Sequence, residues 1–306
     1  MPRRVLFVLA LMVLWAVGAH AQSGQRVFVS NEGADTVTAI DAGSLRVLAS
    51  IKVGRRPHNM NAKGTLVLVA TQGAQEISVV DASRLRTVRR IAVGATPHDV
   101  AAGRGRLAYV LSPEGALVLV DVPAGRVLRT LEVDGRPHDL LVLDDAIWVT
   151  DIATPNIRVL SVRTETVSAR VSLAIPGHDI AVRPGGGEVW ITPWHGDEVV
   201  ILDARTRRLL DRVKVGRSPQ HIAFTPDGRE AWITETATAR VHIIDASRRT
   251  PVAKVGLGGP PHHAALDRQR AYVAVGPSSL VVIDVRTRQV IARIRVGADP
   301  HDVVLP

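Results

Sequence analysis

Residues 57–98 read PHNMNAKGTLVLVATQGAQEISVVDASRLRTVRRIAVGATPH, and this stretch decides the fold. It contains four short runs in which apolar and polar side chains alternate, and Gly, Asp and Pro residues interrupt these runs. A period of two residues is typical of β-strands, and breaks of a few residues join antiparallel neighbours. No run has the 3.6-residue period of a helix, which excludes a helical solenoid. The stretch therefore predicts four antiparallel strands.

The same pattern recurs along the chain at intervals of 39 to 42 residues. One marker is the residue that opens the first strand of each unit: His58, His98, His138, His178, Gln220, His262 and His301. A second marker, in phase with the first, closes the third strand: Asp41, Asp81, Asp121, Ser161, Asp203, Asp245 and Asp284. Radial repetition of four-stranded units predicts an all-β fold, a seven-bladed β-propeller with four antiparallel strands per blade.

The two ends of the repeat array predict how the ring closes. The run RVFVSN at 26–31 matches a second strand, whereas PHDVVLP at 300–306 matches a first strand. We expect the C-terminal strand to become the inner strand of the blade that the N-terminal strand begins, which leaves no free sheet edge at the seam. Residues 22–306 are thus predicted to form a single propeller domain.

Residues 1–21 have the three parts of a secretory signal peptide. MPRR is basic, residues 5–18 are apolar, and AHA at 19–21 is a small-residue cleavage site. The apolar run is too short to cross a bilayer as a helix. We therefore expect cleavage of this segment, a periplasmic or secreted protein, and no membrane span in the mature chain.

Composition narrows the chemistry further. The chain has no cysteine, which excludes disulfides, covalently attached haem c and thiolate metal sites. The formal net charge is +9, but no basic face with interleaved aromatic residues predicts nucleic-acid binding. We expect no nucleotide cofactor, and we expect a monomer.

Short motifs give a family resemblance. FVSN at 28–31, WVTD at 148–151 and WITE at 232–235 each end a second strand, and TVTAID or ARVHIID and then VGxxPH follow. Over residues 26–306 this arrangement resembles the YVTN-repeat family of seven-bladed β-propellers. The resemblance implies the fold and frequent export, and it implies no particular activity.

The recurring histidine points to a metal site. The first strand of each blade lines the central channel of a propeller, so equivalent residues of all blades meet around one axis. Imidazole is the commonest side-chain ligand for zinc and copper ions. We therefore predict a copper or zinc site at the channel mouth with these ligands: His58, His98, His138, His178, His262 and His301. The alternative is that duplication copied a scaffold residue.

Further residues accompany this ring. Gln220 takes the seventh position, and an aspartate follows four of the histidines: Asp99, Asp139, Asp179 and Asp302. Because successive strand residues point in opposite directions, we expect each Asp to accept from a neighbouring blade rather than from its own histidine. His221 and His263 add a second histidine to two adjacent blades.

A few residues at the channel mouth break the repeat. Trp194 and His195 stand in one loop between the second and third strands, and Asp151 and Glu235 occupy the corresponding loops of the two neighbouring blades. His195 with Asp151 or Glu235 could supply a general acid and base, so these three are the weak candidates for catalysis. Trp194 is a secondary candidate for the metal site.

Three functions are compatible with these features. We favour an exported metal-binding propeller that is non-enzymatic or weakly catalytic. The first alternative is a metal-free accessory module that binds a protein of a periplasmic enzyme system. The second is a metal-assisted enzyme of the lactonase or lyase type. Metal analysis separates the first function from the accessory module.

Overall fold

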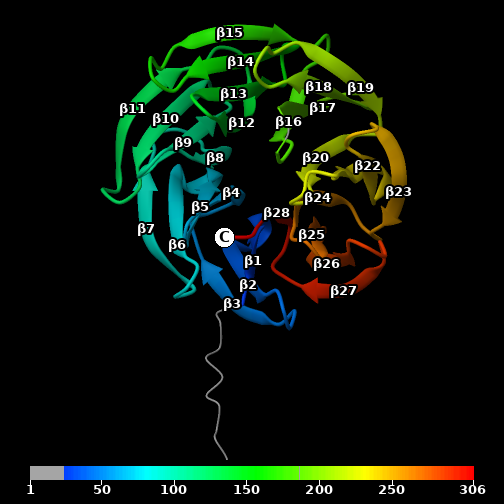
Figure 1. Cartoon of the computed structure of the whole chain (residues 1–306). Coiled ribbons are helices and arrows are strands. Elements are labelled where there is room, and N and C mark those ends of the chain that lie inside the picture. The colour runs from blue at the N-terminus through cyan, green and yellow to red at the C-terminus, as the bar shows by residue number, and fades with distance from the viewer. Residues whose placement is uncertain (1–23, 186) are drawn as a thin grey trace, which may run out of the picture.

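The computed structural model describes residues 24–185 and 187–306, and the predicted signal peptide lies outside them. Within these residues the chain forms seven four-stranded antiparallel sheets, which Figure 1 shows as blades around a central axis. We number the blades I to VII in chain order. This confirms the predicted seven-bladed β-propeller.

Each blade is built from an inner, a second, a third and an outer strand, in that order from the axis. Blade I contains β28 (Pro300–Val304), β1 (Arg26–Asn31), β2 (Thr36–Asp41) and β3 (Val47–Lys52). Blade II contains β4 (Pro57–Lys63), β5 (Leu66–Thr71), β6 (Glu76–Asp81) and β7 (Arg86–Ala92). Blade III contains β8 (Asp99–Ala102), β9 (Leu107–Ser112), β10 (Ala116–Asp121) and β11 (Arg126–Glu132). Blades IV and V contain β12 (Pro137–Leu143), β13 (Ala146–Asp151), β14 (Asn156–Ser161) and β15 (Val167–Ser172); and β16 (Gly177–Val182), β17 (Glu188–Pro193), β18 (Glu198–Asp203) and β19 (Leu209–Lys214). Blades VI and VII contain β20 (Pro219–Phe224), β21 (Glu230–Glu235), β22 (Arg240–Asp245) and β23 (Thr250–Gly256); and β24 (Pro261–Leu266), β25 (Arg270–Val275), β26 (Ser279–Asp284) and β27 (Val290–Arg295).

Among the residues that the structure describes, short 3-10 helices follow the second strand in three blades: η1 (Glu32–Ala34), η2 (Gln72–Ala74) and η3 (Thr236–Thr238). In the described part of the chain, no helix has the length and apolar character needed to span a bilayer.

Blade I closes the ring. β28 pairs antiparallel with β1, and Phe28 lies opposite Val304 while Val29 lies opposite Val303. Figure 1 shows the red C-terminal strand next to the blue N-terminal strands, close to the axis. The predicted closure by the C-terminal strand is therefore confirmed, and the seam is held by the β28–β1 pairing.

The hydrophobic core lies between the blades. Each cluster of buried apolar side chains joins two neighbouring sheets; one joins Leu68 and Ile77 of blade II to Val110 and Val118 of blade III. The aromatic residues of the second strands, such as Trp148, are almost fully buried in these layers. Burial of these side chains fixes the angle between neighbouring blades and thereby the position of every inner strand.

The inner strands begin at one end of the channel, which we call the upper face, and end at the lower face. A β-bulge follows the start of the inner strand in blades II and IV to VII, between the proline or glycine and the third residue after it. The Asp markers of the third strands lie at the lower face. There they accept main-chain N–H groups in tight turns, as in the bonds from Ser44 to Asp41 (2.7 Å) and from Thr287 to Asp284 (2.7 Å).

Candidate functional site

Six of the predicted ligands lie side by side in the channel. The imidazole centroids of neighbouring blades are close together, at 4.3 Å for His58–His98, 4.2 Å for His98–His138 and for His138–His178, 3.7 Å for His58–His301 and 4.8 Å for His262–His301. Gln220 takes the remaining position, and its main-chain carbonyl contacts His178. The repeat thus brings the six imidazoles into one continuous arc, which we call the histidine ring.

Main-chain carbonyls set the tautomer of two ring histidines. Nδ1 of His58 lies 3.3 Å from the carbonyl oxygen of His98, and Nδ1 of His178 lies 3.0 Å from that of Gln220. A carbonyl oxygen only accepts, so Nδ1 of each ring must carry the proton. The lone pair is then on Nε2, which leaves that nitrogen able to bind a metal ion.

Burial keeps most of the ring neutral. It lowers the pKa of His178 to about 4, and together with the neighbouring imidazoles it lowers the pKa of His58 and His301 well below the ordinary value of 6.5. The pKa of His262 is also lowered by burial. These imidazoles are therefore uncharged at neutral pH, which is the form that binds transition metals.

Three of the four aspartates hold neighbouring inner strands together. Asp99 accepts the main-chain N–H of Leu140 at 2.9 Å, Asp179 accepts that of Ile222 at 2.7 Å, and Asp302 accepts that of Met60 at 2.6 Å. In each case the partner belongs to the next blade, as the alternation of side chains predicts. Burial raises the pKa of Asp99 and Asp302 to about 7 and that of Asp179 well above its usual range.

Asp139 behaves differently from the other three. Its Oδ1 accepts a hydrogen bond from Nδ2 of Asn59 at 3.1 Å and lies 3.6 Å from Nδ1 of His98, while its Oδ2 lies 3.4 Å from Nδ1 of His138. The expectation that an Asp stays away from its own histidine is therefore wrong here. A register shift between Pro137 and Leu140 interrupts the alternation at the start of this strand, and blade V has the same shift between Gly177 and Ile180 without such a contact.

The carboxylate of Asp139 influences several imidazoles of the ring. Burial favours the neutral acid, but the His138 and His98 imidazoles outweigh it and hold the pKa of Asp139 well below its usual range. In turn, Asp139 outweighs the burial of His98 and raises the pKa of that imidazole. The same carboxylate acts on the pKa values of His58, His178 and His301. It is thus a buried anion that requires a nearby positive charge.

Two groups of ring residues have the spacing of metal ligands. In the first, which consists of His98, His138 and Asp139, the ligand atoms lie within 4.8 Å of one another. Nδ1 of both imidazoles and Oδ2 of the carboxylate are buried and have no hydrogen-bond partner among the described residues. The second group consists of Glu32, His58 and His301, with the same limit on spacing.

Sequence reasoning missed Glu32 and Asn59. Glu32 stands in the loop between β1 and β2, at the position that carries Trp194 in blade V. The acidic residue at this loop position, next to the channel mouth, could have indicated its approach to the ring. Asn59 replaces the aspartate that follows the ring histidine in four other blades, and this substitution could have indicated its contact with Asp139.

Trp194 covers one side of the ring. Its indole stacks on His178 with centroids 5.3 Å apart and lies 5.6 Å from His138. The side chain is 38% exposed, so its outer face meets solvent. His195, which is exposed, follows it, with ring centroids 5.7 Å apart. These two residues therefore belong to the channel mouth, as predicted from their loop.

His221 and His263 take the place of the aspartates in blades VI and VII. Their rings stack with centroids 4.1 Å apart. Nδ1 of His221 accepts the main-chain N–H of Ala264 at 3.3 Å, the same link to the next blade that the aspartates make. Nδ1 of His263 lies 3.0 Å from Oδ1 of Asp302. Both histidines thus connect inner strands.

The weak catalytic candidates Asp151 and Glu235 are buried within their own blades. Oδ2 of Asp151 pairs with Nη1 of the buried Arg158 at 2.6 Å. Oε1 of Glu235 lies 2.9 Å from Nδ1 of His242, and its Oε2 accepts from the Thr238 hydroxyl at 2.6 Å. Within residues 24–185 and 187–306, neither carboxylate forms an ion pair with His195. The structure places His195 outside both pairs.

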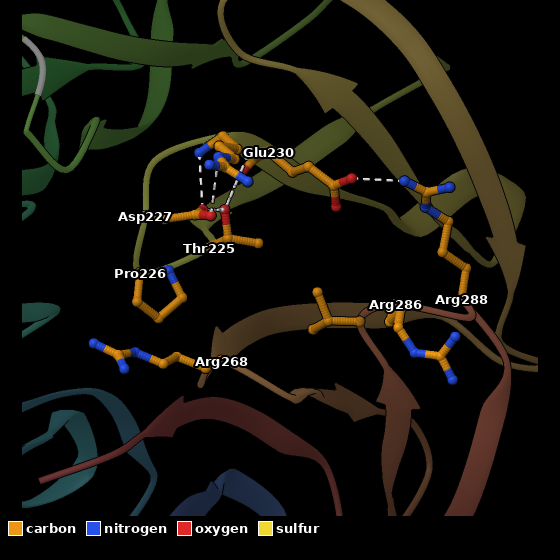
Figure 2. A pocket seen from close by; sticks show the side chains of 9 residues that line it. Thr225, Pro226, Asp227, Glu230, Arg268, Arg286 and Arg288 are labelled. Atoms are coloured by element: carbon orange, nitrogen blue, oxygen red, sulfur yellow. Dashed lines mark hydrogen bonds and ion pairs between the residues drawn. The ribbon is translucent and has the colours of Figure 1, made fainter.

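A pocket of about 540 Å³ lies on the lower face, between blades VI and VII. It contains four arginines, but Arg288 pairs with Glu230 at 2.6 Å and Arg229 with Asp227 at 3.4 Å. Figure 2 shows the side chains of Arg268 and Arg286 pointing away from each other. The pocket therefore does not gather polar groups around one point, in contrast to the histidine ring.

Comparisons with models of protein families and with curated proteins find no match. Solved structures with a similar fold include the Kuenenia stuttgartiensis hydrazine synthase, with a TM-score of 0.74 and 19% identity over 90% of this chain and 94% of that chain. A functionally unknown protein from Desulfotomaculum acetoxidans matches with a TM-score of 0.81 and 12% identity over 92% and 99% of the two chains. The dihydro-heme d1 dehydrogenase NirN in complex with DHE matches with a TM-score of 0.68 and 16% identity over 88% of this chain and 63% of that chain. At these identities the likeness concerns the fold, and this chain is similar to these structures as a β-propeller.

Proposed function

We propose that this protein is a metal-binding β-propeller in which His98, His138 and Asp139 hold a copper or zinc ion. The observation that supports this most directly is the set of three buried atoms without hydrogen-bond partners: Nδ1 of His98, Nδ1 of His138 and Oδ2 of Asp139. Buried polar groups are normally paired, and an orphan set is the pattern expected of a site that awaits an ion. All three atoms are of ligand type.

The charge of the site favours a cation. Asp139 is a buried carboxylate that stays ionised because of the adjacent imidazoles. Burial of an unpaired charge is costly, so either a proton on His98 or a metal ion must balance it. A divalent ion does so while also satisfying the two free nitrogens, which a proton on one ring cannot do. Metal binding should therefore displace that proton.

The donor set indicates the kind of metal. Imidazole nitrogens suit zinc and copper, whereas calcium and magnesium prefer oxygen ligands throughout. Two nitrogens and one carboxylate oxygen leave at least one coordination position for water or another molecule. The ion would thus be held by the protein and remain able to bind a further ligand from the channel.

The location and family are part of the proposal. The signal-peptide features of residues 1–21 support export to the periplasm or the exterior, and the YVTN-type motifs support membership of the YVTN-repeat family. A rigid, cysteine-free scaffold would present the same imidazole geometry in an oxidising compartment.

The test is metal binding by the purified protein after removal of metal with a chelator. We expect wild type to bind Cu²⁺ and Zn²⁺ in calorimetric titrations and to retain metal in elemental analysis after gel filtration. The double variant His98→Gln/His138→Gln should lose at least one equivalent. His262→Gln is the matched control, because His262 belongs to the ring but to neither ligand group. Absence of binding by wild type, or unchanged binding by the double variant, would contradict the proposal and favour a metal-free interaction module.

A further inference from the structure

We infer that the histidine ring holds a second metal ion next to the first, with Glu32, His58 and His301 as its ligands. This inference deepens the proposed function and depends on it. The ligand atoms of these three residues lie within 4.8 Å of one another, and they share no residue with the first group. The two sites together would form a dinuclear centre in the channel mouth.

Main-chain hydrogen bonds bring Glu32 to the ring. The N–H of Glu32 donates to the carbonyl of Asp299 at 2.8 Å, and that of Gly33 donates to the carbonyl of Ala298 at 3.1 Å. Residues 298–299 lead directly into β28, which carries His301. A Cβ at Gly33 would meet the Asp299 side chain at 2.5 Å, so glycine permits this close approach. The loop is therefore docked in a fixed position beside His301.

Glu32 is specific to this blade. The residue that follows the second strand is acidic in blade I, whereas the other six blades have these residues there: Gln72, Pro113, Ile152, Trp194, Thr236 and Gly276. Simple copying of the repeat would leave a neutral residue at this position in blade I as well. The acidic residue instead stands beside His58 and His301, and one carboxylate with two imidazoles is a typical set of metal ligands.

The two imidazoles have the form that a metal ion requires. His58 and His301 are the closest ring neighbours, with centroids 3.7 Å apart. Burial and the adjacent imidazoles disfavour protonation of both. The contact of Nδ1 of His58 with the carbonyl of His98 leaves its Nε2 free. Two neutral nitrogens held this closely repel each other less when a cation lies between them.

Arg56 orients the carboxylate of Glu32 and weakens the site. Its Nη2 and Nε donate to Oε1 of Glu32 at 2.5 and 3.0 Å, which leaves Oε2 for an ion. A partner of this kind fixes the orientation of a ligand, but its positive charge opposes a nearby cation. The Arg56 side chain is 62% exposed, so solvent screens much of that opposition. We expect the second ion to bind more weakly than the first.

The two groups are immediate neighbours because the centroids of His58 and His98 lie 4.3 Å apart. Two Cu²⁺ ions at such neighbouring sites interact magnetically, which gives a signature that separate sites on one protein would lack. The expected sequence is an isolated Cu²⁺ spectrum at one equivalent, followed by broadening or loss of signal intensity at two equivalents.

The experiment titrates metal-free protein with Cu²⁺ and records calorimetry and electron paramagnetic resonance spectra. We expect two equivalents for wild type, with the spectral change at the second. Glu32→Gln should bind one equivalent and show only the isolated spectrum. Arg56→Gln should keep two equivalents and bind the second severalfold more tightly. The matched control is Glu114→Gln, an acidic residue in the corresponding loop of blade III that is bonded to the Thr96 hydroxyl, and it should behave as wild type.

The outcomes separate the two proposals. If wild type binds one equivalent, and His98→Gln/His138→Gln abolishes it while Glu32→Gln does not, the second site is wrong and the first stands. Two equivalents that Glu32→Gln leaves unchanged also overturn the second site. No binding by wild type overturns both.

Discussion

The main-chain N–H of Met60 donates to Oδ2 of Asp302 at 2.6 Å, although 242 residues separate the two in sequence. Met60 lies on the inner strand of blade II and Asp302 on that of blade I. Asp99 and Asp179 form the same link to Leu140 and Ile222. These three of the four aspartates that follow ring histidines thus connect adjacent inner strands, and they do so as buried carboxyl groups with raised pKa values.

Replacement of Asp302 by Asn should remove a pH dependence of stability. Burial raises the pKa of Asp302 to about 7 from an ordinary value of 3.8, so between these values the folded state holds a proton that the unfolded state has lost. This contribution to stability is present at low pH and is lost as pH rises toward 7. From pH 5 to pH 8 the variant should gain about 3 kcal/mol relative to wild type. Urea unfolding of the metal-free proteins at both pH values measures this.

Asp284→Asn serves as the control for that measurement. Hydrogen bonds from Thr287 lower the pKa of Asp284, so the group is ionised in both states at pH 5 and at pH 8. Its effect on stability should therefore be the same at the two pH values. An equal response of the Asp302 and Asp284 variants would show that Asp302 is not protonated in the folded protein.

Replacement of His178 by Gln should reduce the loss of stability in acid. Burial lowers the pKa of His178 to about 4, so below pH 6.5 the unfolded chain takes up a proton that the folded protein does not. Stability is lost as pH falls from 6.5 toward 4. Between pH 6.5 and pH 5 the wild type should lose about 2 kcal/mol more than the variant. Parallel stability profiles for the two proteins would contradict this interpretation.

Removal of the Asp151 carboxylate should destabilise the propeller strongly. Arg158 is 2% exposed, and Asp151 pairs with its Nη1 at 2.6 Å. Loss of one partner leaves a buried guanidinium incompletely paired, which costs about 3–5 kcal/mol. We expect Asp151→Ala to lower the free energy of unfolding by this amount, and Arg158→Met/Asp151→Leu to recover part of it. A loss below about 1 kcal/mol for Asp151→Ala would show that Asp134, the other partner of Arg158, is sufficient.

Trp194 should report the arrival of copper. Its indole lies 5.3 Å from His178 and 5.6 Å from His138, whereas Trp148, Trp190 and Trp232 are buried between blades. Paramagnetic Cu²⁺ quenches tryptophan fluorescence at short range. We expect Cu²⁺ to quench part of the emission of wild type and much less of that of Trp194→Phe. Zn²⁺, which is diamagnetic, should cause little quenching in either protein, and equal quenching of both proteins by Cu²⁺ would place the ion away from Trp194.

Most of the fold could be predicted from the sequence because the propeller consists of similar units. The spacing of the ring histidines and of the third-strand aspartates predicted the number of blades, and the strand types at the two ends of the array predicted the closure; both predictions are confirmed. The same spacing also predicted that the imidazoles lie around one axis. The contacts of individual side chains in the ring could not be predicted, because they depend on packing that the repeat pattern does not specify.

Asp139 and Asp99 illustrate this limit. Both follow a ring histidine, yet burial raises the pKa of Asp99 while two imidazoles hold that of Asp139 low. The difference depends on the neighbours of each carboxylate. Asp139 lies 3.6 and 3.4 Å from the imidazoles of His98 and His138, whereas the negative charge of Asp139 adds to burial in raising the pKa of Asp99. Glu32 illustrates the other limit. Its proposed role as a ligand depends on a loop docking against residues 298–299, a contact between the two ends of the propeller that local sequence patterns do not show.

The closure of blade I by β28 has a consequence for the behaviour of the ring. The covalent chain does not cross the junction between β28 and β1, so this is where the circle can open. Glu32 directly follows β1 and His301 lies on β28, so an ion bound by both would link these two strands across the junction. Opening of the circle would then require release of the ion, and by mass action a higher metal concentration would shift the equilibrium toward the closed ring.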